Sequence, residues 1–287
     1  MQSKRSKWFL RNAPVALVVL SAAGLLGIVL LRSDAGSRSA TPGNNRPVPA
    51  IAPSGPVARQ LSCEVVGAYP HDPSAFLQGL VWYDGGFYES TGLEGRSTLR
   101  RVDFPSGAVV KSLALAPDLF GEGLTLVSNH LVQLTWTSHR GFVYDRETFR
   151  LLREFQYDTE GWGITWDGKN LIMSDGSAAL TYLDPDTFQP VRRLPVTMNG
   201  QPLANLNELE FIEGRIWANV WQTDWIVCID PNSGQVDSFL DLAGILPATS
   251  RTGSEDVLNG IAFDPQAKRI FVSGKCWPKL FEIRVRN

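Results

Sequence analysis

The sequence is poor in the residues that build metal centres and nucleophilic triads. It has only three cysteines and three histidines, which are Cys63, Cys228 and Cys276, and His71, His130 and His139. Neither set has the spacing of a zinc site. The chain also lacks a Gly-x-Ser-x-Gly elbow and a phosphate-binding loop. These absences argue against zinc enzymes, elbow-type serine hydrolases and P-loop nucleotidases.

The sequence has no large excess of either charge. Lysine and arginine number 27 against 29 aspartates and glutamates, and the formal net charge is −2. No basic run occurs outside the first 12 residues, which argues against nucleic acid as a partner. Three cysteines in an exported domain could form at most one disulfide. We expect them instead to be buried free thiols.

The N-terminal 31 residues have the pattern of a membrane segment. A basic flank at residues 1–12 precedes an uncharged, largely apolar stretch at 13–31. At about 1.5 Å per residue this stretch nearly spans a bilayer core of about 30 Å. The flank predicts that everything after Leu31 is extracytoplasmic. A cleaved signal peptide is the alternative, but Ser33-Asp34-Ala35 beside Arg32 is a poor cleavage site, so we favour an uncleaved anchor.

Residues 32–60 and 61–287 differ sharply in composition. The first segment is rich in Pro, Ser, Gly and Asn and cannot bury enough surface to offset its ordering entropy, so it is expected to be a flexible tether. The second segment has a length that suits a single closed all-β domain.

The region 61–287 contains five repeats, each with one side chain just ahead of an apolar strand. The repeats recur about every 40 to 50 residues, the period of propeller blades. Their leading side chains are Gln78, Glu122, Trp162, Asn207 and Asn259. Further apolar strands follow in each repeat, separated by Asp-Gly, Glu-Gly or Asp-Pro turns. Recurring aspartates in these turns (Asp103, Asp145, Asp184 and Asp230) are expected to cap the turns rather than to do chemistry.

The last repeat ends one strand short, and the extended segment Cys63–Tyr69 can supply the missing strand. We therefore predict an all-β fold, a five-bladed β-propeller whose last blade is closed by an N-terminal strand. The first strand of each blade is innermost in a propeller. The five leading side chains should then form a ring around one mouth of the channel.

A second ring is expected at the same mouth, where the second strand of each repeat ends. Antiparallel pairing brings the start of the first strand and the end of the second strand to one face. The members of this ring are Gly92, Trp136, Asp175-Gly176, Trp221 and Lys275. Phe76 and Phe120, two residues before ring members, are expected to join them.

Glu122 is the only carboxylate in the first ring. Aromatic walls should raise its pKa and Lys275 should lower it, and the sequence does not decide the direction of the net pKa shift. The glycines on either side of Glu122 are expected to let a ligand approach closely. A single carboxylate is too few for a glycosidase. An aromatic-walled pocket with one acid, several amides and one cation suits a small polar ligand with an apolar frame.

Several stretches resemble the plant-type glutaminyl-peptide cyclotransferases. They lie in every repeat and include Tyr69-Pro-His-Asp-Pro-Ser-Ala-Phe-Leu-Gln-Gly-Leu80, Phe120-Gly-Glu-Gly-Leu-Thr-Leu126, Asp158-Thr-Glu-Gly-Trp-Gly163, Leu206-Asn-Glu-Leu-Glu210, Trp217-Ala-Asn-Val-Trp-Gln-Thr-Asp224 and Ser273-Gly-Lys-Cys-Trp-Pro-Lys-Leu-Phe-Glu282. The resemblance covers residues 69–287 and leaves out the anchor and the tether.

The resemblance implies a five-bladed propeller that converts N-terminal glutamine of peptides to pyroglutamate, releases ammonia and needs no catalytic metal or other cofactor. The family's active-site glutamate corresponds to Glu122. Its other pocket residues correspond to Phe76, Gln78, Phe120, Trp136, Trp162, Asn207, Trp221 and Lys275. Asn259 has the ring position but no role implied by the resemblance.

The substrates implied are peptides or proteins with N-terminal glutamine. The predicted anchor places their processing outside the cytoplasm, and we expect the catalytic domain to be monomeric. Two other functions use the same pocket. A binding propeller would hold a peptide or small ligand without chemistry. A metal-dependent lactone or ester hydrolase on the same fold would need a metal ion.

Overall fold

The structure is a computed structural model that describes residues 57–286. This part of the chain is all-β, and its only helix is a short 3-10 turn, Ala248–Ser250. The predicted anchor and most of the predicted tether lie outside the described residues. Within residues 57–286 no helix is long and apolar enough to cross a bilayer.

Three sheets are antiparallel four-stranded meanders, in which each strand pairs with the next along the chain. The first contains β2 (Leu77–Tyr83), β3 (Gly86–Thr91), β4 (Thr98–Asp103) and β5 (Val109–Ala114). The second contains β6 (Gly121–Val127), β7 (His130–Thr135), β8 (Arg140–Asp145) and β9 (Leu151–Gln156). The third contains β10 (Ile164–Trp166), β11 (Leu171–Ser174), β12 (Ala179–Leu183) and β13 (Pro190–Pro195).

The remaining long strands form one eight-stranded sheet, made of two four-stranded units. One unit contains β16 (Leu206–Ile212), β17 (Arg215–Val220), β18 (Trp225–Ile229) and β19 (Val236–Asp241). The other contains β20 (Leu258–Asp264), β21 (Arg269–Gly274), β22 (Lys279–Arg286) and the N-terminal β1 (Arg59–Pro70). A small hairpin of β14 (Thr197–Met198) and β15 (Gln201–Pro202) precedes β16.

Strand β1 completes the last unit, as the sequence predicted. It pairs antiparallel with β22 over Ser62–Pro70. It also pairs in parallel with β19 at Arg59–Leu61, which was not predicted and which joins the last two units into one sheet. Strand structure thus begins at Arg59, slightly before the predicted boundary at residue 61.

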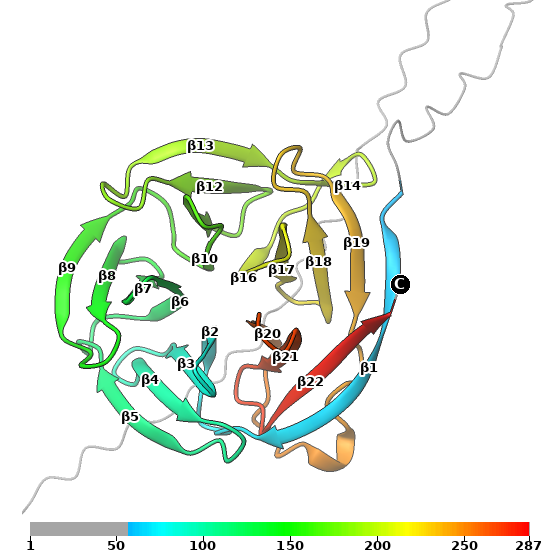
Figure 1. Cartoon of the computed structure of the whole chain (residues 1–287), viewed down its shortest axis with the longest axis horizontal. Coiled ribbons are helices and arrows are strands. Elements are labelled where there is room, and N and C mark those ends of the chain that lie inside the picture. The colour runs from blue at the N-terminus through cyan, green and yellow to red at the C-terminus, as the bar shows by residue number, and fades with distance from the viewer. Residues whose placement is uncertain (1–56, 287) are drawn as a thin grey trace, which may run out of the picture. The chain divides into compact units, whose positions relative to one another are not determined.

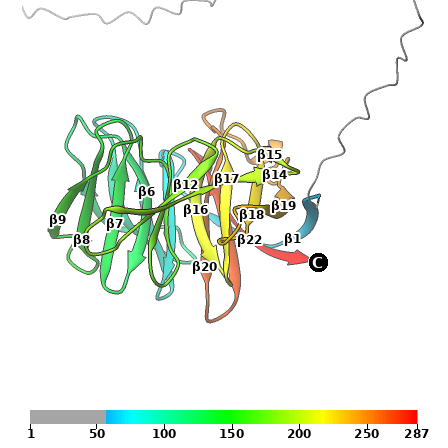
Figure 2. The ribbon, with the colours of Figure 1, turned by 90° about the horizontal axis from the view of Figure 1, so that it is seen from above.

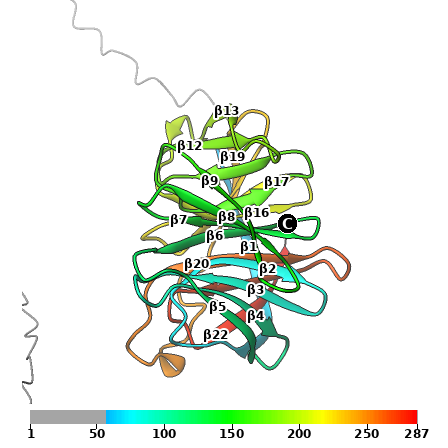
Figure 3. The same ribbon diagram turned by 90° about the vertical axis from the view of Figure 1, so that its left-hand side faces the viewer.

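The four-stranded units are arranged around a central axis (Figure 1). Strands β2, β6, β10, β16 and β20 lie innermost and contact one another in succession, and β20 contacts β2, so the ring is closed. Seen from two other directions, the innermost strands run roughly along this axis (Figure 2, Figure 3), whereas outer strands such as β13 and β19 lie across it (Figure 1). The innermost strands therefore begin at one face of the ring.

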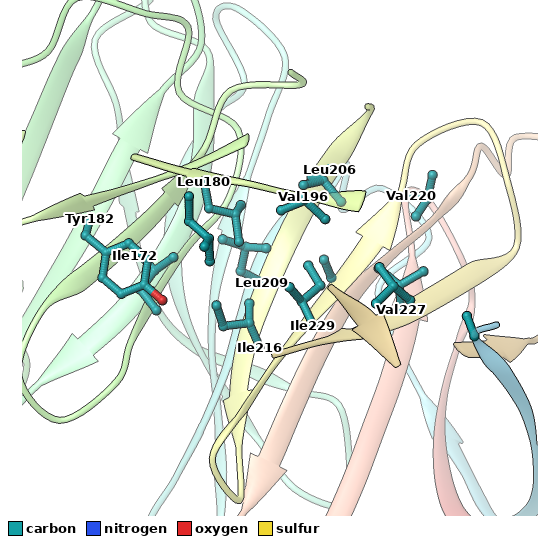
Figure 4. Close-up of a cluster of buried hydrophobic side chains, with 14 residues drawn as sticks. Ile172, Leu180, Tyr182, Val196, Leu206, Leu209, Ile216, Val220, Val227 and Ile229 are labelled. Carbon is teal, nitrogen blue, oxygen red and sulfur yellow. The ribbon is translucent and has the colours of Figure 1, made fainter. Parts of the chain in front are cut away.

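Apolar side chains pack between neighbouring units. The cluster in Figure 4 joins Ile172, Leu180 and Tyr182 of the third unit to Leu209 and Ile216 of the fourth. Each fully buried aliphatic side chain contributes about 1.5–3 kcal/mol. Burial between units thus holds the strand starts, and the side chains ahead of them, in fixed positions.

The predicted aspartate turns are confirmed at Asp145, Asp184 and Asp230, and at Asp103 the carboxylate accepts a hydrogen bond from Ser106 Oγ at 2.6 Å. The Oδ1 atom of Asp145 accepts hydrogen bonds from Thr148 N at 2.8 Å and Thr148 Oγ1 at 2.6 Å. Asp184 and Asp230 bind Thr187 and Ser233 in the same way. These hydrogen bonds hold the pKa of each of the three carboxyls below its ordinary value.

The three cysteines are free thiols, as expected. Only Cys228 is fully buried, whereas Cys63 and Cys276 are half-buried. Burial raises the pKa of the Cys228 thiol to about 12, which makes it unreactive at neutral pH.

Candidate active site

The two predicted rings meet at one face of the described domain. Backbone hydrogen bonds join their segments directly: Trp136 N donates to Phe120 O at 3.0 Å, and Gly92 N donates to Phe76 O at 2.8 Å. Trp221 and Lys275 are held by equivalent bonds to Asn205 O and Val257 O. The sequence therefore placed the ends of the second strands correctly beside the starts of the first.

Four of the five inner strands have a bulge at the ring position. The pairing register shifts between Leu77 and Gly79 in β2, between Gly121 and Leu124 in β6, between Leu206 and Leu209 in β16, and between Leu258 and Ile261 in β20. A bulge leaves one residue out of the ladder and re-aims its side chain. The residues freed in this way include Gln78, Glu122, Asn207 and Asn259.

Glu122 is a buried carboxyl with one direct polar contact. It is 5% exposed, and Gln78 Nε2 donates a hydrogen bond to its Oε1 at 2.8 Å. Gly123 has a packing role that the sequence did not show. A Cβ on Gly123 would lie 2.7 Å from Gly163 Cα and Ile164 N, so this glycine lets two inner strands approach each other closely.

The structure decides the balance of charges on Glu122. Burial raises its pKa, Lys275 lowers it, Glu160 raises it, and the net pKa lies well above the ordinary value. The pKa of Lys275 is lowered, because burial outweighs the attraction of Glu122 and Asp256. The pair therefore consists of an acid that holds its proton more firmly and an amine that holds its proton less firmly than in water.

The aromatic side chains form two groups. In one, Phe120 makes edge-to-face contacts with Phe76 at 6.0 Å and with Trp136 at 5.5 Å between ring centroids. In the other, Trp162 contacts Trp221 at 5.5 Å. The Nζ atom of Lys275 lies 4.9 Å from the centre of the Phe76 ring, a cation–π contact.

Glu160 joins the two aromatic groups and was missed by the sequence analysis. Its Oε2 accepts hydrogen bonds from Trp136 Nε1 at 2.7 Å and from Trp162 Nε1 at 2.9 Å. Glu160 lies inside a stretch that carries the family resemblance, but nothing in its local pattern shows that one carboxylate serves two indoles. That contact depends on how β7 and the β9–β10 connection pack together.

The two ring asparagines have different surroundings. Asn207 is 4% exposed, and its Oδ1 has no hydrogen-bond partner among the described residues. Buried polar atoms are normally paired, so an unpaired one at this face is suited to a bound ligand. Asn259 is 0% exposed and donates from Nδ2 to Leu77 O and to Gln78 Oε1.

Glu208 and Glu210 are two further buried carboxyls that the sequence analysis did not single out. The two oxygens of Glu208 accept from Leu80 N at 3.2 Å and Ile261 N at 2.8 Å, so this side chain ties β16 to β2 and β20. Glu210 accepts from Phe263 N, and burial raises its pKa to about 8. These hydrogen bonds to the backbone of neighbouring inner strands give both residues a structural role in holding the strands together.

Cavity size does not identify this site. A cavity of about 770 Å³ lies elsewhere, beside the β16–β17 and β20–β21 turns, and includes Ile212, Arg215 and Phe263 but no ring residue. Within residues 57–286 no group of three or more His, Cys, Asp or Glu side chains lies close enough to hold a metal ion. The assignment of the site therefore rests on its side-chain chemistry.

Comparison with known proteins agrees with the resemblance. A family model described as glutamine cyclotransferase matches residues 40–285. The chain is 41% identical over 228 residues to a glutaminyl-peptide cyclotransferase of Arabidopsis thaliana, covering 78% of this chain and 71% of that protein. The crystal structure of Myxococcus xanthus glutaminyl cyclase superposes with a TM-score of 0.74 at 38% identity, over 80% of this chain and 98% of that one. The chain therefore belongs to the glutamine cyclotransferase family.

Proposed function

We propose that this enzyme converts the N-terminal glutamine of peptides to pyroglutamate and ammonia, with Glu122 as the proton carrier. The family membership supports the reaction. The observation that supports the role is the position of Glu122, a buried carboxyl with a raised pKa at the aromatic face, beside Gln78 and Lys275. A carboxyl whose pKa is raised well above the ordinary value binds a proton more readily, which suits a group that must both accept and give one.

The reaction takes place within one residue of the substrate. The α-amine nitrogen attacks the side-chain amide carbon, a C–N bond forms, and the carbonyl oxygen becomes an oxyanion. Glu122 accepts a proton from the attacking nitrogen and gives it to the leaving nitrogen. The original C–N bond then breaks, ammonia departs and the carbonyl re-forms. No net proton stays on the enzyme.

The other site residues bind and orient the substrate. The aromatic side chains Phe76, Phe120, Trp136, Trp162 and Trp221 hold the glutamine in a folded, near-attack shape, which is the main requirement of an intramolecular reaction. Lys275, Asn207 and Gln78 hold the amide and stabilise the oxyanion. The unpaired Oδ1 of Asn207 supports a contact with the amide of the substrate.

We interpret the five four-stranded units as the five blades of a β-propeller, with β1 as the outer strand of the last blade. The closed succession of inner strands supports this interpretation.

We further propose that residues 13–31 anchor a monomeric catalytic domain on the extracytoplasmic side of a membrane. N-terminal sequencing of the mature protein tests the anchor, since a start near Gly36 contradicts it, and sedimentation of the catalytic domain tests the monomer.

The function is tested by ammonia release from a glutamine-initiated dipeptide, with and without a chelator. We expect release of one ammonia per pyroglutamate formed, at a rate that the chelator does not change. Measurable peptide binding without ammonia release would support the binding propeller instead. Chelator-sensitive hydrolysis of lactones or esters would support the metal-dependent hydrolase.

Replacing Glu160 with alanine is expected to weaken substrate binding. The indoles of Trp136 and Trp162 lose their shared acceptor, so the two aromatic groups no longer hold a fixed distance. Two hydrogen bonds to a carboxylate are lost, so we expect KM for a glutamine-initiated dipeptide to rise at least about tenfold, with a smaller change in kcat.

The matched control is Glu94→Ala, which removes an exposed carboxylate from the β3–β4 connection on the same face. It should leave KM near the wild-type value. Equal KM changes in both variants would show that the charge matters and the contact with the indoles does not.

A further inference from the structure

Gln78 contacts Glu122 through an amide whose two ends behave differently. The nitrogen end donates hydrogen bonds and the oxygen end only accepts them. Because Gln78 Nε2 faces Glu122 Oε1 at 2.8 Å, this orientation favours the ionised carboxylate. Half a turn of the amide would present Gln78 Oε1 instead and would favour the protonated acid. The orientation of the amide therefore affects the proton affinity of Glu122.

Asn259 restrains that orientation from β20. Its Nδ2 donates to Leu77 O at 3.1 Å and to Gln78 Oε1 at 3.2 Å. A backbone carbonyl can only accept, so Leu77 O selects the nitrogen end of Asn259. That nitrogen in turn selects the oxygen end of Gln78. The carbonyl of Leu77 thus fixes the orientation of the Asn259 amide, and Asn259 fixes that of the Gln78 amide. As a result, Gln78 Nε2 points at Glu122.

We propose that Asn259 is a positioning residue of the cyclisation site, which acts on Glu122 through Gln78. This inference takes its catalytic meaning from the proposed function. Asn259 is fully buried at the bulge of β20, and its Oδ1 has no hydrogen-bond partner among the described residues. An unpaired buried acceptor is costly. An apolar side chain would avoid that cost, so the donor end of Asn259 is what the site requires.

Other charged groups reach Glu122 by different routes. Lys275 acts from the β21–β22 connection and Glu160 from the β9–β10 connection. Burial and the nearby Glu122 raise the pKa of Tyr157, in the segment after β9, to about 12, so this side chain is uncharged at neutral pH. Among the described residues, none of the three is hydrogen-bonded to the side chain of Asn259. A substitution at Asn259 should therefore reach Glu122 through Gln78.

The test replaces Asn259 with leucine, which removes both donors and approximately preserves volume. Gln78 is then free to turn its oxygen towards Glu122. We expect kcat/KM for a glutamine-initiated dipeptide to fall about tenfold at neutral pH, mostly in kcat. The acidic limb of the pH–rate profile should move to higher pH, because the carboxylate loses its donor.

A double-variant cycle separates positioning from a general loss of structure. In a Gln78→Leu background, adding Asn259→Leu should change kcat/KM by less than about twofold, since the intermediary is already gone. The matched control is Asn219→Leu, which removes another fully buried amide that bonds Gly260 N and not Gln78. Its effect should be additive with Gln78→Leu and should leave the acidic limb unchanged.

A readout without turnover completes the test. The titration of the Glu122 carboxyl, followed by ¹³C NMR in the full-length protein, should have a higher midpoint in Asn259→Leu than in the wild type. An unchanged midpoint, or additive losses in the cycle with Gln78→Leu, would overturn the proposal. If the wild-type protein released no ammonia, the proposed function would fail, and the NMR titration would still decide the role of Asn259.

Discussion

Replacing Glu122 with glutamine is expected to lower kcat for glutamine-initiated peptides by about 10²–10⁴-fold. Glutamine preserves the shape and can still accept the hydrogen bond from Gln78 Nε2 through its own oxygen. It cannot carry a proton from the attacking amine to the leaving nitrogen. Because the contacts with the substrate remain, we expect a much smaller change in KM. Steady-state kinetics of ammonia release measures both quantities.

The same substitution should not destabilise the fold at neutral pH. The pKa of Glu122 is raised above its ordinary value of 4.5 in the folded protein. Above about pH 4.5 the carboxyl therefore ionises more readily in the unfolded chain than in the folded protein, and this difference lowers the free energy of unfolding. Glutamine removes this loss of stability. The melting temperature of Glu122→Gln should therefore equal or exceed that of the wild type at pH 7, and the difference should disappear below about pH 4.

The matched control for this experiment is Glu210→Gln. Glu210 is also a carboxyl with a raised pKa, but its hydrogen-bond partners, Phe263, Phe211 and Thr165, are not residues of the proposed pocket. We expect near wild-type turnover from this variant. Near wild-type turnover from Glu122→Gln would instead remove Glu122 from the proton-transfer role.

Deleting residues 1–70, which removes β1, is expected to lower the melting temperature by at least about 10 °C relative to deletion of residues 1–56. Strand β1 pairs with β22 on one side and with β19 on the other, so its loss exposes two strand edges. Its side chains Leu61 and Tyr69 also pack against two hydrophobic clusters, and Ala58, just before the strand, belongs to a third.

The expected size follows from those contacts. A fully buried apolar side chain contributes about 1.5–3 kcal/mol, and the partly buried Leu61 and Tyr69 contribute less each, so the lost pairing with β22 and β19 adds to the effect. One kcal/mol corresponds to about 2–4 °C in a domain of this length. Thermal unfolding followed by circular dichroism compares the two truncations. Hydrogen exchange should show the largest loss of protection in β22 and β19. Equal melting temperatures would mean that β1 does not close the ring.

Most of the fold was predictable because its signals are local. Alternating apolar residues, Asp-Gly and Glu-Gly turns and the capping aspartates each act over a few residues, and these patterns located most of the strands of the five repeats. The N-terminal strand was predictable because the last repeat is visibly incomplete. The parallel pairing of β1 with β19 was not predictable, since it depends on where the strand ends after the ring has closed.

The site was predictable only in part. Repetition placed Gln78, Glu122, Asn207 and Asn259 at one face, and the resemblance selected Glu122 among them. The packing role of Gly123 was not predictable, because the strand that approaches it comes from the next unit. Glu160 was missed because a carboxylate shared by two indoles leaves no pattern along the chain.

The sequence by itself determined the all-β class, the repeats, the family and the residue types gathered at the mouth. Each of these follows from local patterns along the chain or from motifs that match the family. The tertiary structure alone decided how those residues act on one another. Gln78 and Glu122 are 44 positions apart, and Asn259 and Gln78 are 181 apart, yet each pair is joined by one hydrogen bond. Burial and Lys275 act on Glu122 in opposite directions, and only their distances and packing decide that its pKa rises.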